Sequence, residues 1–111
     1  MANIQIMNGV TNLIPENENE VNGYTIIDVR NPDEFIGDLG HIPGARLSTL
    51  GGELQHYLTT IDKSEKYLFV CKVGGRSTQA VLFAKSIGFT DVTNLAGGMI
   101  RWNEFDFKTE T

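Results

Sequence analysis

Cys71 is the single cysteine of the 111-residue chain, and it stands where an apolar run changes into a glycine-rich, cationic segment. The run is Tyr67-Leu68-Phe69-Val70, and the segment after the cysteine is Lys72-Val73-Gly74-Gly75-Arg76-Ser77. A helical pattern follows, so Cys71 is predicted to lie in a turn from a strand to a helix. Backbone N–H groups and the positive end of the helix dipole converge at such a turn and favour a thiolate over a thiol. Cys71 is therefore a candidate nucleophile.

The two glycines of this segment favour an anion-binding loop. Gly74 and Gly75 carry no Cβ, so the loop can turn tightly with its N–H groups directed at one point. The alternative is that Cys71 is a small core hydrophobe, which is the more common role of a lone cysteine at the end of an apolar strand. The glycines and cations of the loop favour the functional interpretation.

The charges of the chain are distributed unevenly. The formal net charge of -5 argues against nucleic acid or an anionic membrane as the main partner. The stretch from Tyr67 to Thr90 nevertheless contains Lys72, Arg76 and Lys85 and no carboxylate. These cations suit a small anionic substrate, and a solvated cationic surface is the alternative interpretation.

Length and composition predict a small single domain. The 111 residues, with 41% hydrophobic content, are enough for one core, so we expect one domain over residues 1–111. One cysteine cannot form an internal disulfide, and the first twenty residues resemble no targeting signal, so a cytoplasmic location is the default expectation. One cysteine and two distant histidines provide no metal-ligand spacing, and we expect no metal and no cofactor.

Short apolar runs alternate with helical patterns, with a spacing typical of βα units rather than hairpins. Strands are expected at 24–29, 67–71 and 91–95, and helices at 53–61, from 76 towards 88, and at 99–105, with a short helix starting after Asn31. Residues 4–7 are a candidate edge strand. The uninterrupted run before Cys71 predicts a strand buried on both faces in a parallel sheet. Ligands bind beyond the carboxyl ends of such strands, where Cys71 is placed.

Four segments in order carry a family resemblance. They are Asp28-Val29-Arg30 with Glu34-Phe35, Gly40-His41-Ile42-Pro43-Gly44-Ala45, Cys71 to Ser77, and Leu95-Ala96-Gly97-Gly98 with Trp102. Together they resemble the signature of single-domain rhodanese-like sulfurtransferases, over about residues 24–102. The resemblance implies an α/β fold of three layers, α/β/α, with a central parallel sheet.

The length of the cysteine loop separates two chemistries within this superfamily. Cys71 and Arg76 enclose four residues, as in rhodanese-type sulfurtransferases, whereas the related dual-specificity phosphatases have five. The resemblance therefore implies attack on sulfane sulfur rather than on phosphorus. One departure lies between Phe35 and Gly40, where the chain is a residue or two longer than is usual, so the rim near His41 is expected to differ.

The resemblance implies double displacement through a persulfide on Cys71. The donor would be thiosulfate or another small anionic sulfane donor, and the acceptor cyanide, a thiol or a protein cysteine. The implied substrate-binding residues are Lys72, Val73, Gly74, Gly75, Arg76 and Ser77, and Lys72 is the candidate for attracting the donor. Because the chain has no second cysteine, the persulfide must pass to an external acceptor.

Several of these side chains have a structural interpretation beside the functional one. Arg76 either binds the anion or braces the loop, with neither role favoured. Ser77 is interpreted as a helix cap rather than as a hydroxyl near the thiolate. Asp28, Arg30 and Glu34 are interpreted as structural support, with Arg30 between two carboxylates.

Three functions follow from this interpretation. The first is an enzyme, a thiosulfate sulfurtransferase of the rhodanese type. The alternative is a non-enzymatic rhodanese-like module that relays sulfur or docks onto a partner, because fold alone does not establish activity. The third, a phosphatase-like hydrolase, rests only on the shared form of the loop.

Overall fold

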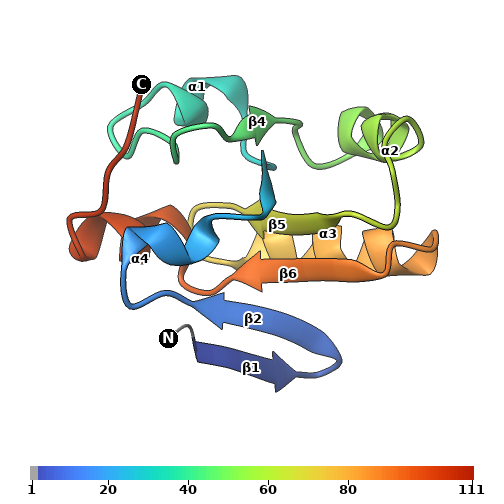
Figure 1. The fold of residues 1–111 in the computed structure, drawn as a ribbon. Helices are drawn as coiled ribbons and strands as arrows, with labels where there is room; N and C mark the ends of the chain where they lie inside the picture. Colours follow the sequence, from blue (N-terminus) through green and yellow to red (C-terminus); the bar gives the residue numbers. More distant parts are fainter. Residues whose placement is uncertain (1–2) are drawn as a thin grey trace.

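The computed structural model describes residues 3–111, and in that range six strands form one sheet in the order β1-β2-β6-β5-β3-β4 (Figure 1). The strands are β1 Asn3–Met7, β2 Val10–Ile14, β3 Thr25–Asp28, β4 Arg46–Leu47, β5 Lys66–Val70 and β6 Asp91–Leu95. All neighbouring pairs are parallel except β1 with β2. The expected central parallel sheet is thus confirmed for its inner strands.

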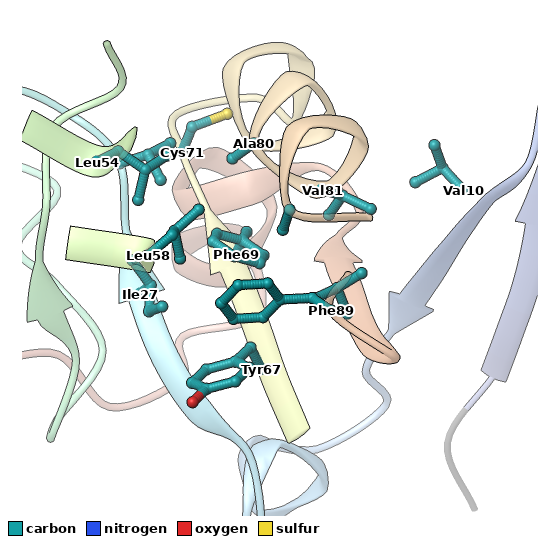
Figure 2. Packing of buried hydrophobic residues seen from close by; sticks show 13 residues of the cluster. Val10, Ile27, Leu54, Leu58, Tyr67, Phe69, Cys71, Ala80, Val81 and Phe89 are labelled. Carbon is teal, nitrogen blue, oxygen red and sulfur yellow. The ribbon is translucent and has the colours of Figure 1, made fainter. Parts of the chain in front are cut away.

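Helices cover both faces of this sheet. They are α1 Pro32–Phe35, α2 Gly52–Leu58, α3 Gly75–Ser86 and α4 Gly98–Glu104, with a 3₁₀ turn at Glu18–Val21. Two buried clusters lie on opposite faces. One joins the sheet to α2 and α3 through residues such as Leu54, Leu58 and Val81, and Figure 2 shows it. The other packs Met99 and Trp102 of α4 against the opposite face. The predicted three-layer architecture is confirmed.

Strand β5 is buried on both faces, as its apolar run predicts. Tyr67 and Phe69 belong to the cluster under α2 and α3, whereas Leu68 and Val70 belong to the cluster under α4. Each of the four side chains is at most 1% exposed. This alternation is the period of two of a strand, and it places Cys71 directly after the most deeply buried strand end.

The N-terminal edge of the sheet corrects the sequence-based prediction. β1 and β2 form an antiparallel hairpin, and β2 then pairs with β6 in parallel. The turn is Asn8-Gly9, with positive φ angles of 52° and 78°, which fits the twist of a two-residue hairpin. The expectation of βα units without hairpins was therefore wrong at this edge. The Asn-Gly pair was the signal that could have revealed it.

The remaining elements differ from expectation mainly at their ends. β6 has the predicted bounds, and α3 begins at Gly75, one residue early. α2 ends at Leu58, before the predicted end at 61. The hydroxyl groups of Thr59 and Thr60 donate to the carbonyls of His56 and Tyr57 and compete with continuation of the helix. The two-residue strand β4 had no pattern long enough to predict it.

Within residues 3–111, no helix has both the length and the apolar character needed to cross a membrane. The same range holds no group of three His, Cys, Asp or Glu side chains arranged to bind a metal ion.

Candidate active site

The Cys71 sulfur lies at the carboxyl end of β5, inside the loop that leads to α3. Its Sγ accepts a hydrogen bond from the backbone N–H of Gly74 at 3.0 Å. Gly74 is the N-cap of α3 and has a φ of 110°, a conformation that side chains disfavour. A Cβ at this position would meet only ordinary contacts, the nearest at 3.6 Å. The backbone conformation that directs this N–H at the sulfur, rather than lack of space, therefore calls for glycine.

Ser77 lies in the first turn of α3 with its side chain at the sulfur. Its Oγ is 3.2 Å from the Cys71 Sγ and also contacts the Oδ1 of Asn94. The interpretation of Ser77 as the helix cap was wrong, because Gly74 occupies the N-cap position. The hydroxyl instead lies near the candidate nucleophile, which was the alternative considered from the sequence.

Burial and hydrogen bonding act in opposite directions on the Cys71 thiol. Burial raises its pKa because a charged sulfur loses hydration. Hydrogen bonds outweigh this effect and hold the pKa of Cys71 below the ordinary value for cysteine. They come from the Ser77 hydroxyl and from the backbone N–H groups of Ser77, Gly74 and Val73. The loop therefore favours the thiolate, as its glycine-rich sequence predicts.

The sulfur is enclosed by the protein. Cys71 is 0% exposed and belongs to the same buried cluster as Val29, Leu54 and Ala80. Figure 2 shows Cys71 at the end of β5, beside Ala80 of α3. A donor molecule reaches the sulfur only when neighbouring side chains or the loop move aside.

Arg76 braces the loop against α1. Its guanidinium makes two hydrogen bonds to the Glu34 carboxylate, at 2.8 and 2.9 Å. The Arg76 hydrogen bonds lower the pKa of Glu34 to about 2, against the opposing effect of burial and with help from the Asn31 N–H. Pairing with Glu34 likewise raises the pKa of Arg76. Of the two roles considered for Arg76, this geometry favours the brace.

Asp28 and Arg30 form a separate, fully buried ion pair. The Arg30 Nε and Nη2 donate to the Asp28 carboxylate at 2.9 and 2.8 Å, and Nη2 also donates to the Gly40 carbonyl at 2.7 Å. Both side chains are at most 1% exposed. Arg30 thus forms the expected structural ion pair with Asp28, whereas Glu34, the second carboxylate near it in the sequence, bonds Arg76. Asp28 and Arg30 thus fix the end of β3 to the turn that contains Gly40.

The start of α4 holds the other side of the cysteine loop. The N–H groups of Met99 and Ile100 donate to the carbonyls of Cys71 and Lys72, at 2.9 and 3.0 Å. A Cβ on Gly98 would overlap these two carbonyl oxygens. Gly98 is therefore required by close backbone contact, which explains the glycine pair at this turn.

Lys72 and Val73 have exposed side chains, and each lines a different pocket. Lys72 borders a pocket of about 410 Å³ that Arg30 and Glu34 also line. Val73, which is 63% exposed, borders a pocket of about 470 Å³ between the β1–β2 hairpin and α3. The structure thus groups Lys72, Val73 and Gly74 of the loop with Gly75, Arg76 and Ser77 of the first turn of α3 around Cys71. Asp28, Arg30 and Glu34 lie beside them as support.

Two asparagines near this loop were not predicted from the sequence. Asn94 of β6 is 3% exposed and contacts Ser77, and its Nδ2 donates to Asn12 of β2 at 2.8 Å. A polar residue inside a short strand of otherwise buried residues was the available signal for Asn94. Asn12 had no such signal, because its strand was not recognised.

His41 takes no part in this arrangement. Its Nδ1 donates to the Phe35 carbonyl at 2.8 Å, and its ring stacks on Phe35 with centroids 3.7 Å apart. These are the local contacts expected of a turn residue.

Comparisons with known proteins agree with this geometry. The profile of the rhodanese-like domain matches residues 12–105. The thiosulfate sulfurtransferase GlpE of Ectopseudomonas mendocina is 32% identical over 90 residues, covering 81% of this chain and 79% of that protein. A senescence-associated protein of Raphanus sativus is 31% identical over 99 residues, and this chain covers only 53% of its length.

Solved structures show the same fold. A rhodanese-related protein from Thermoplasma volcanium superposes with a TM-score of 0.72 at 27% identity, covering 86% of this chain and 95% of that one. A rhodanese-like domain protein from Staphylococcus aureus has a TM-score of 0.66 at 31% identity, with 79% and 82% covered.

Proposed function

The chain belongs to the rhodanese-like domain family, and we propose that it is a sulfurtransferase that carries sulfane sulfur as a persulfide on Cys71. The observation that carries this proposal is the environment of the sulfur. Cys71 Sγ accepts the Gly74 N–H, lies 3.2 Å from the Ser77 hydroxyl and has a lowered pKa. A thiolate is the nucleophilic form of cysteine, and this loop stabilises it.

We propose thiosulfate or another persulfide as the donor. The Cys71 thiolate attacks the outer sulfur of thiosulfate, a new S–S bond forms, and sulfite leaves with the electron pair of the broken bond. The acceptor, cyanide or a thiolate of a small molecule or protein, then attacks the outer sulfur of the persulfide. Cys71 leaves as the thiolate, so neither step needs an oxidant or a reductant. One relative is a thiosulfate sulfurtransferase, and this supports thiosulfate as the donor.

The loop residues have distinct roles in this proposal. Lys72 is exposed and attracts the anionic donor towards the loop. The backbone N–H groups of Val73, Gly74 and Ser77 stabilise negative charge on sulfur. Arg76 holds the loop in place through Glu34.

We further propose that residues 1–111 act as one rhodanese-like domain. The cytoplasmic location stays a prediction from the sequence.

A specific observation favours a second candidate, the sulfur-relay or docking module. Because Cys71 is 0% exposed, sulfur transfer requires movement around the sulfur. Binding of a donor protein can supply the free energy for that movement, whereas a small anion makes few contacts. The phosphatase-like function gains no comparable support, since Arg76 is already bonded to Glu34.

Intact mass measurement tests the proposal. The reduced protein is incubated with thiosulfate, and we expect the gain of one sulfur atom, which cyanide removes. The Cys71→Ser variant is the control and should gain none. If the protein acquires sulfur only from a persulfide-bearing protein, the relay function replaces the thiosulfate enzyme. If no sulfane donor of either kind adds sulfur to Cys71, the proposed function is refuted.

A further inference from the structure

A chain of hydrogen bonds runs from the hairpin at the sheet edge to the Cys71 sulfur. The Asn12 Nδ2 donates to the Val10 carbonyl at 3.1 Å, and the Asn94 Nδ2 donates to the Asn12 Oδ1 at 2.8 Å. The Asn94 Oδ1 contacts the Ser77 Oγ, which lies 3.2 Å from the Cys71 sulfur. Residues 82 positions apart in the sequence are thus linked beside the candidate nucleophile.

The Val10 carbonyl determines the direction of this chain. A carbonyl oxygen only accepts, so the Asn12 amide must present its Nδ2 to Val10 and its Oδ1 to Asn94. Asn94 must then present its Nδ2 to Asn12, which leaves its Oδ1 facing Ser77. An amide oxygen cannot donate, so Ser77 is the donor in this contact.

Ser77 has only one hydroxyl proton to give, and three acceptors lie within its reach: the Asn94 Oδ1, the Cys71 sulfur at 3.2 Å and the Gly74 carbonyl at 3.3 Å. If that proton lies on the bond to Asn94, the Ser77 oxygen presents a lone pair to Cys71, and it can accept from a thiol but cannot stabilise a thiolate. If the hydroxyl turns to a thiolate, the Asn94 Oδ1 loses its donor at a site that is 3% exposed. A buried acceptor without a donor is unfavourable. The Cys71 thiolate and Asn94 therefore compete for the same proton.

We propose that Asn94, oriented by Asn12, is a positioning residue that competes with the Cys71 sulfur for the Ser77 hydroxyl proton. The proposal rests on the proposed role of Cys71 as the nucleophile. The backbone N–H of Gly74 remains directed at the sulfur in either state of Ser77. The asparagine pair thus limits how far the thiolate is stabilised.

This limit has a chemical consequence. A thiolate of lower pKa is more abundant at neutral pH but is intrinsically a weaker nucleophile. By reducing the stabilisation that Ser77 can give, Asn94 keeps the sulfur more reactive per ionised molecule. The effect is a balance between the amount of thiolate and its reactivity.

The charged groups around the loop are not part of this chain. They are Asp28 and Arg30 at the end of β3, Glu34 on α1, Lys72 and Arg76 after the cysteine, and Arg101 of α4, whose side chain packs against Gly97. Asp28 pairs with Arg30, and Glu34 pairs with Arg76. Substitution of an asparagine in the chain removes no partner from either ion pair, so a change in the thiol can be attributed to the asparagine.

The test is the rate of Cys71 alkylation by iodoacetamide as a function of pH in Asn94→Leu and Asn12→Val. Either change should release Ser77 to donate to the thiolate. We expect the pH profile to move to lower pH, with a rate roughly three- to tenfold higher on its acidic limb and a slightly lower plateau. Asn12 is only partly buried, so Asn12→Val carries the test if Asn94→Leu does not fold.

Ser77→Ala in each background supplies the decisive comparison. It should move the profile to higher pH in every background, and by more in Asn94→Leu or Asn12→Val than in the otherwise natural protein. Gln5→Val is the matched control. Gln5 faces Asn12 across the hairpin and lines the pocket that Asn12 and Asn94 also line, but it takes no part in the hydrogen bonds from Asn12 to Ser77. Its profile should not change.

The opposite pattern overturns the proposal. If both asparagine variants leave the profile unchanged or move it to higher pH, Asn94 does not compete with the sulfur for the Ser77 proton. The same conclusion follows if Ser77→Ala has equal effects in all backgrounds. Alkylation requires no sulfur donor, so this result stands apart from any failure of sulfur transfer by the protein.

Discussion

Glu34 and Arg76 lie 42 residues apart in the sequence and form a two-point ion pair between α1 and the first turn of α3. Glu34 also lines the pocket that Lys72 borders, and the N–H groups of α4 bond the loop carbonyls. The cysteine loop is thus held by contacts from elements that precede and follow it, and several measurable properties depend on them.

The Glu34–Arg76 pair should make stability depend on acid pH. The folded state lowers the pKa of Glu34 from 4.5 to about 2, so the pair stabilises the fold fully above pH 4.5 and loses this effect as pH falls towards 2. The side chains of Arg76 and Glu34 are 35% and 26% exposed, which reduces the expected contribution to about 1 kcal/mol. Urea unfolding of the natural protein and Glu34→Gln should differ at pH 7 and converge near pH 2. A difference that is constant with pH would contradict this assignment.

Kinetics can separate the brace from a donor-binding role for Arg76. If Arg76 acts through Glu34, then Glu34→Gln, Arg76→Ala and the double variant should lower sulfur transfer by similar factors, because each breaks the same pair. If Arg76 binds thiosulfate, Arg76→Ala should raise the KM for thiosulfate about tenfold or more, and Glu34→Gln should not. Steady-state kinetics with cyanide as acceptor measures both quantities, and Asp91→Asn, at the exposed start of β6, is the control.

Asp28 should be essential for folding. Asp28→Asn leaves the Arg30 guanidinium buried without its countercharge, and breaking a buried pair in this way costs about 3–5 kcal/mol. Thermal unfolding followed by circular dichroism should show a much lower midpoint or no folded state at all. Asp33→Asn removes an exposed carboxylate close by and should leave the midpoint nearly unchanged. Equal midpoints for the two variants would show that the buried pair contributes little.

The local sequence allowed the prediction of the elements around the nucleophile but not of its partners. The apolar run of β5, the glycines of the loop and the Asn31-Pro32 helix start are short-range signals, and each was found where expected. The contacts of Glu34 with Arg76 and of Asn94 with Asn12 join residues 42 and 82 positions apart. No periodicity or propensity reports such pairs, because they depend on which strands become neighbours in the sheet.

Ser77 illustrates the same limit at short range. Its position at the start of a helix is typical of a cap, and a serine there has two common roles. Which role applies depends on the φ of Gly74, since the left-handed conformation of this glycine makes it the N-cap and places Ser77 one turn later. Sequence alone does not specify that angle.

Gly74 provides a test of the hydrogen bond to sulfur. Gly74→Ala forces a side chain into a φ of 110°, and the relaxed loop should turn the N–H away from Cys71. We expect the pKa of Cys71 to rise, seen as an alkylation profile moved to higher pH. Gly23→Ala imposes similar backbone strain at a φ of 91° with no contact to the site, so it should destabilise the protein without moving the profile. If the alkylation profile of Gly74→Ala does not move, the Gly74 N–H does not stabilise the Cys71 thiolate.

The backbone contacts of α4 have an energetic consequence for the chemistry. The carbonyls of Cys71 and Lys72 are held by the N–H groups of Met99 and Ile100, with Gly98 allowing the close approach. Peptide groups fixed in this way cannot rotate to follow a change of charge at the sulfur. Their dipoles are already oriented before a thiolate forms. In the proposed sulfur transfer these two peptide groups would need little reorganisation energy, because they were oriented when the protein folded.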